Sequence, residues 1–72
     1  MAVRFKRVVV SAWCANPAES RNCCRLVLSD EAEIDAAIGR VPWTSPDLLK
    51  SAAGRFKKCI DDCGGKTTVV DS

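Results

Sequence analysis

A chain of 72 residues, of which 47% are hydrophobic and 28% charged, has the composition of a packed domain and not of a disordered protein. Its formal net charge of +2 is too small to require a nucleic-acid partner, and no apolar run reaches the roughly 18 residues that a membrane-spanning helix needs. We therefore expect a single domain over residues 1–72, of modest stability because so short a chain buries only about 60–65% of its unfolded surface.

The first third of the chain predicts a hairpin. Residues 3–14 are rich in β-branched and aromatic side chains without Gly or Pro, which predicts a strand buried on both faces. Residues 15–21 collect turn formers, although Asn16 and Pro17 could also begin a helix. Because apolar and polar residues alternate over 22–29, we predict a second strand there.

The middle and the end of the chain predict two helices and a third strand. Ser29 followed by a run of acids is typical of a helix N-terminus, and Gly39 ends that short helix. A second helix is predicted over 46–63, where apolar residues recur at helical spacing after Ser45 as the cap. Residues 66–71 then read as a strand.

These elements predict an α+β fold in the order ββααβ. We expect a small three-stranded sheet with the first strand at its centre, the last strand beside it, and two helices packed on one face. If every element reverses direction, the first and last strands pair in parallel. The other face would stay uncovered and would carry Val9 and Val27 with Arg7 and Arg25, and such exposed apolar surfaces commonly bind a partner.

The state of the cysteines distinguishes a domain cross-linked by disulfides or a metal ion from one held by an ordinary hydrophobic core. There are five, with no histidine: Cys14, Cys23, Cys24, Cys59 and Cys63. A four-thiolate zinc site is conceivable, because Cys59 and Cys63 share one helix face. However, neighbouring residues of a strand point to opposite faces, and two of the cysteines lie in an apolar helical stripe, so we predict reduced core thiols. We accordingly expect a cytoplasmic chain with no metal and no cofactor, and keep metal binding and a disulfide or redox role as alternatives.

Catalytic chemistry has little support. Histidine, the most common general base, is absent, and no nucleophile has an evident activating partner. Residues 64–67 contain phosphate-loop residue types, but they follow a helix, whereas a phosphate loop follows a strand. We predict that the chain is not an enzyme and has no catalytic residues.

Charge is segregated along the chain. Residues 1–28 carry five cations against Glu19, and residues 29–47 carry five acids against Arg40. The two blocks either complement each other within the fold or leave a basic hairpin as a binding face. Trp43 is expected to pack between helix and sheet, and Trp13 either to stack on a partner or to cover the sheet. The candidate partner-binding residues are Arg4, Lys6, Arg7, Trp13, Arg21, Arg25 and Trp43.

Three functional hypotheses follow. The first is a protein-binding module acting as an inhibitor or adaptor, of the kind that phage and mobile elements encode as anti-defence (anti-CRISPR-type) proteins, with a homodimer through the uncovered sheet face as a variant. The second is a nucleic-acid-binding regulator that uses the basic hairpin. The third is a cysteine-based metal-binding or redox protein.

Overall fold

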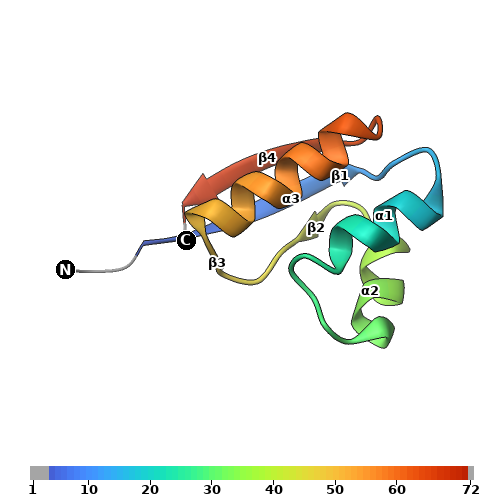
Figure 1. Ribbon diagram of the computed structural model, residues 1–72, viewed down its shortest axis with the longest axis horizontal. Helices are drawn as coiled ribbons and strands as arrows, with labels where there is room; N and C mark the ends of the chain where they lie inside the picture. The colour runs from blue at the N-terminus through green and yellow to red at the C-terminus, as the bar shows by residue number, and fades with distance from the viewer. Residues whose placement is uncertain (1–3, 72) are drawn as a thin grey trace.

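The computed structural model describes residues 4–71 and confirms the α+β fold class. Three helices and a four-stranded antiparallel sheet make up this part of the chain (Figure 1). In chain order, the elements are β1 (Phe5–Ala12), α1 (Pro17–Cys24), α2 (Glu31–Ile38), β2 (Trp43–Thr44), β3 (Leu48–Leu49), α3 (Lys50–Asp62) and β4 (Lys66–Asp71). None of these helices is long and apolar enough to cross a membrane.

Strand β1 is the centre of the sheet, as predicted. It pairs with β4 along one side and with β2 and β3 along the other, and every pairing is antiparallel. The parallel pairing expected for the first and last strands is therefore wrong. The chain folds α1 and α2 together at one end of the sheet, then returns through β2 and β3, reverses into α3 and reverses again into β4 (Figure 1). These three changes of direction leave β4 opposite to β1.

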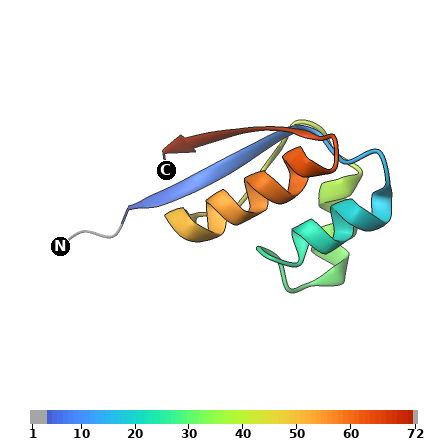
Figure 2. The ribbon, with the colours of Figure 1, turned by 45° about the horizontal axis from the view of Figure 1, so that its top comes forward.

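All three helices lie on one side of the sheet (Figure 2). Val8 and Val10 of β1 are fully buried on that side. Helix α3 meets the sheet with Ala53, Phe56 and Ile60, whose spacing of three and four residues forms a single buried stripe. The amphipathic pattern thus predicted the helix and its orientation, although α3 begins at Lys50 and not at 46.

Ser45 explains the late start of α3. Its backbone N–H donates to the carbonyl of Val8 over 2.9 Å, and its Oγ accepts the N–H of Val8 at 2.8 Å and donates to the carbonyl of Pro46. The side chain thereby takes the place of a strand carbonyl in the gap between β2 and β3. Ser45 is not the predicted helix cap, because its hydroxyl is used in the sheet.

The predicted strand over 22–29 is wrong, because residues 17–24 form helix α1. Asn16 caps this helix by accepting the N–H of Ala18 at 2.9 Å, and Pro17 occupies the first turn. These are strong helix-start features, and they outweigh the weak alternation that follows. As a result, Arg25 and Val27 follow a helix and do not lie on an uncovered sheet face.

Helix α2 confirms the first predicted helix with a shift of one residue in its cap. Asp30, and not Ser29, accepts the N–H of Ala32 at 2.9 Å. Ile34 and Ala37 are the buried residues of this helix.

The expectation of five reduced core thiols is also wrong. Cys14 is bonded to Cys63 and Cys23 to Cys59, with Cα–Cα distances of 5.0 and 5.7 Å. Cys24 is the free cysteine, and it is buried. The error has the same origin as the predicted second strand: in a helix, Cys23 and Cys24 can both face inward, and α1 brings Cys23 against α3.

Candidate protein-binding face

No helix or strand of residues 4–71 covers the face of the sheet opposite the helices (Figure 2). Side chains alternate along a strand, so Val8 and Val10 enter the core while Phe5, Arg7 and Val9 point the other way. Residues paired across an antiparallel ladder share a face, which adds members from the neighbouring strands. We call this surface the open face; it consists of Phe5, Arg7, Val9, Thr44, Leu49, Thr68 and Val70.

The open face exposes large apolar side chains. Leu49 is 53% exposed, Phe5 43% and Val70 40%. Phe5 is paired with Leu49 on one side of β1, and it lies diagonally across from Val70, the partner of Arg7, on the other side. The three apolar residues therefore lie at one end of the face, with Phe5 between the other two. A contiguous apolar group on a small protein is typical of an interaction surface.

Ion pairs border this surface. Arg7 Nε donates to Asp47 Oδ1 at 2.8 Å, which neutralises the cation on the open face. On the helix side of β1, Lys6 pairs with Asp71, and this hydrogen bond lowers the pKa of the Asp71 carboxyl. Arg4 is exposed just before β1. Three of the predicted partner-binding residues thus lie in β1 or just before it: Arg4, Lys6 and Arg7. Of these, Arg7 belongs to the open face itself.

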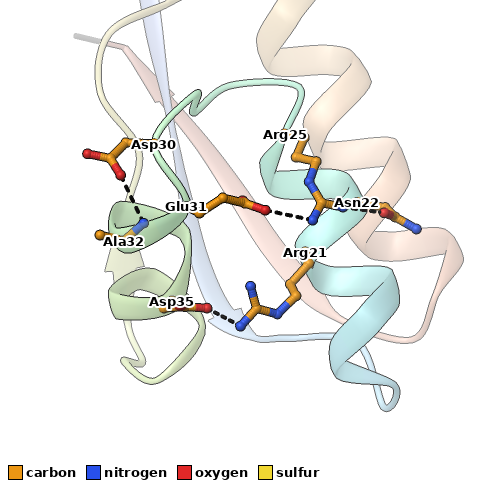
Figure 3. Close-up of polar contacts among 7 residues, drawn as sticks. All are labelled: Arg21, Asn22, Arg25, Asp30, Glu31, Ala32 and Asp35. Atoms are coloured by element: carbon orange, nitrogen blue, oxygen red, sulfur yellow. Dashed lines mark hydrogen bonds and ion pairs between the residues drawn. The ribbon is translucent and has the colours of Figure 1, made fainter.

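Two other predicted binding residues lie between α1 and α2, at the end of the sheet (Figure 3). Arg21 pairs with Asp35, while Arg25 donates to Glu31 at 2.9 Å and to Asn22 at 2.7 Å. The basic and acidic blocks of the sequence therefore complement each other within the fold, as one of the two interpretations predicted.

Both tryptophans pack against the helix layer. The ring centroids of Trp13 and Trp43 are 5.6 Å apart. The ring centroid of Phe56 lies 6.4 Å from that of Trp13 and 6.0 Å from that of Trp43. Trp13 also donates its indole N–H to the carbonyl of Arg40 at 3.2 Å. The expected packing of Trp43 is confirmed, and Trp13 joins the same half-buried aromatic cluster.

Sequence reasoning placed Val9 on the uncovered side but missed the three most exposed apolar members of the open face, Phe5, Leu49 and Val70. Phe5 could have been found, because it alternates with Arg7 and Val9, which were assigned to the uncovered side. Val70 alternates in the same way within the predicted last strand. Leu49 carried no such signal, since it falls within the helical pattern that was assigned to 46–63.

The cysteines form the other chemically distinctive cluster. The sulfur atoms of Cys14, Cys23 and Cys63 all lie within 4.8 Å of one another, an arrangement that could hold a metal ion in the reduced chain. Burial raises the pKa of the Cys24 thiol to about 11, so this fifth cysteine is protonated and unreactive at neutral pH.

Comparison with known proteins adds no relative: no family model and no curated protein matches the sequence.

Proposed function

We propose that this chain is a non-enzymatic protein-binding module that docks a partner protein on the open face of its sheet, as an inhibitor or adaptor. The observation that carries the proposal is the exposure of Phe5, Leu49 and Val70 together on a face that none of the described helices covers. Burying these side chains against a partner would add favourable free energy of about 25 cal/mol for each Å² of apolar surface removed from water.

The chemistry of the open face favours a protein over a nucleic acid. A polyanion needs unpaired cations to replace its counterions, whereas Lys6, Arg7, Arg21 and Arg25 already face carboxylates within the chain. The expected partner presents an apolar centre with polar groups around it, which suits the neutral Arg7–Asp47 pair at this surface.

Strand β4 supports the same conclusion. Among the described strands it pairs with β1 alone, so its outer edge offers backbone N–H and C=O groups next to Val70. An extended segment of a partner could add to this edge while its side chains contact the open face.

The biological setting is part of the proposal. Small stand-alone inhibitors of this size are frequent in phage and mobile-element genomes, and we propose that this chain is a host-takeover or anti-defence protein of that kind, whose partner is a host protein. The cytoplasmic location was expected because all five thiols were predicted to be reduced. With four cysteines in disulfides, that argument no longer applies, because disulfides persist mainly in oxidising compartments.

The test compares two double variants in affinity capture. Leu49→Lys with Val70→Lys changes the open face. Leu26→Lys with Val41→Lys changes a leucine and a valine outside it that are at least comparably exposed, at 51% and 56%. We expect a stoichiometric partner that the native chain and the control retain and that the open-face variant loses by at least about tenfold, the effect of roughly 1.4 kcal/mol.

Equal retention by both variants would contradict the proposal, as would the absence of any stoichiometric partner. Sedimentation analysis of the same proteins distinguishes a second copy of the chain from a separate partner. If the native chain and the control sediment as dimers and the open-face variant as a monomer, the partner on the open face is a second copy of the chain and not a separate protein.

A further inference from the structure

The four bridged cysteines form one compact sulfur cluster. Cys14 follows β1, Cys23 lies in α1, and Cys59 and Cys63 lie in and at the end of α3. The sulfurs of Cys14, Cys23 and Cys63 fall within 4.8 Å of one another. The sulfur of Cys59 is bonded to that of Cys23, so it lies no more than one S–S bond outside this group.

The group formed by the sulfurs of Cys14, Cys23 and Cys63 is close in size to a tetrahedral zinc site. Zinc binds thiolates at about 2.3 Å, which places the sulfurs of a four-cysteine site about 3.8 Å apart. A disulfide holds its two sulfurs at about 2.05 Å. Opening each bridge by about 1.8 Å, and bringing the two pairs of sulfurs to the same distance from each other, would therefore give the separations that zinc requires.

We propose that Cys14, Cys23, Cys59 and Cys63 form a redox-exchangeable zinc site: two disulfides in the oxidised chain and a four-thiolate zinc centre in the reduced chain. Two dithiol molecules supply the reduction, each giving two electrons and two protons to one bridge and itself becoming a cyclic disulfide. The four thiols then release four protons as zinc binds their sulfurs. Two molecules of a disulfide oxidant, such as oxidised glutathione, reverse the exchange: they accept the four electrons of the thiolates and four protons from solvent, become four glutathione thiols, and leave the two bridges and the released ion.

The surroundings of the cluster give reductant and metal a way in. A groove of about 310 Å³ is lined by the Cys23–Cys59 bridge and by Cys63, and Glu19, Asn22 and Asp62 complete its lining. The two carboxylates at this groove favour the approach of a cation. All-sulfur ligation selects a soft or borderline ion such as zinc over magnesium or calcium.

The site has a matched control in its own sequence. Cys24 is next to Cys23 in α1 but remains outside the bridges as a buried thiol. Replacing Cys23 removes one ligand, whereas replacing Cys24 changes the core without touching the ligand set.

The experiment uses the full chain, reduced with dithiothreitol and freed of reductant under anaerobic conditions, and zinc alone as the probe. We expect one zinc ion per chain, a dissociation constant of about 10 nM or less, and release of four protons. Cys23→Ser should weaken binding by more than about 100-fold, since losing even an outer hydrogen-bond partner of a ligand costs about 10–100-fold. Cys24→Ala should bind like the native chain.

Cobalt(II) bound to the unmodified sequence provides a readout that does not depend on a variant folding. Tetrahedral ligand-field bands, with sulfur charge transfer corresponding to four thiolates, would support the site. Micromolar or weaker zinc binding, a six-coordinate cobalt spectrum, or equal losses in Cys23→Ser and Cys24→Ala would overturn the proposal. So would zinc binding to a reduced chain whose amide NMR spectrum stays undispersed, because the ion would then be held by an unfolded chain.

Discussion

Two buried serines show how single residues complete this small fold. Ser20 and Ser45 are the buried polar residues of the described chain, and each accepts a backbone N–H of another segment through Oγ. Ser20 binds Cys14 at 3.0 Å, and Ser45 binds Val8 at 2.8 Å. Each hydroxyl therefore satisfies a backbone group that would otherwise be buried without a partner, a loss that is costly in a protein interior.

Ser45→Ala should therefore lower the free energy of unfolding by about 1–3 kcal/mol, because the N–H of Val8 loses its acceptor. Urea unfolding followed by circular dichroism measures this change. Thr44→Ala is the control: it alters the adjacent, exposed position and should change stability by less than about 0.5 kcal/mol. Equal effects of the two substitutions would contradict the role assigned to Ser45.

At the scale of elements, the accuracy of sequence reasoning followed the strength of each local signal. The stripe of α3 and the β-branched run of β4 are long and regular, and both elements were predicted. Strands β2 and β3 have two residues each, too few to show any periodicity. Helix α1 was not predicted, because the alternation of residue types over 22–29 favoured a strand over the helix start at Asn16. That alternation falls mainly in the turn that follows the helix.

The turn between α3 and β4 depends on two glycines with different roles. Gly64 has φ = +93°, a conformation that side chains disfavour. At Gly65 the backbone itself is accessible to any residue, but an added Cβ would lie 2.4 Å from Ile60 Cγ2 and 2.7 Å from the carbonyl oxygen of Ala12. The close approach of this turn to β1 therefore requires glycine at 65.

Substituting alanine for two glycines should give opposite results. Gly65→Ala forces the turn away from Ile60 and should lower the unfolding free energy by about 1–3 kcal/mol, as overpacking usually does. Gly54→Ala, within α3, meets nothing within 4 Å and should raise it by roughly 0.5–1 kcal/mol through helix propensity. Thermal unfolding of the two variants measures both; a stabilising Gly65→Ala would show that the turn is packed differently.

For the whole molecule, the two bridges connect the first third of the chain to the end of α3. They span 49 and 36 residues, and loops of this length correspond to about 4 kcal/mol each when closed singly in the chain-entropy model. The bridges are nested, so the second closes a shorter loop and adds less. For a 72-residue domain this is comparable to the total stability expected of such a chain.

The pairing could not be predicted from the sequence. Five cysteines offer five choices of free thiol with three pairings for each, and only the contact of α1 with α3 selects among them. The open face was partly predictable, because the alternation in β1 placed Arg7 and Val9 there. Its most exposed apolar member, Leu49, depended on where α3 begins, which Ser45 determines through a contact distant in sequence.

The central structural claim is that two disulfides, Cys14–Cys63 and Cys23–Cys59, join the start of the chain to α3 and leave Cys24 free. Disulfide mapping of the oxidised, unreduced protein tests this claim most directly. The protein is first unfolded in denaturant without reductant, so that the buried Cys24 thiol becomes accessible, and free thiols are then alkylated. Trypsin with a protease that cleaves before aspartate separates Cys59 from Cys63 at Asp61 and Asp62. Electron-transfer fragmentation distinguishes Cys23 from Cys24. We predict Cys14 linked to Cys63, Cys23 linked to Cys59, and the alkyl group on Cys24. Five alkylated cysteines, or any bridge that includes Cys24, would contradict the account.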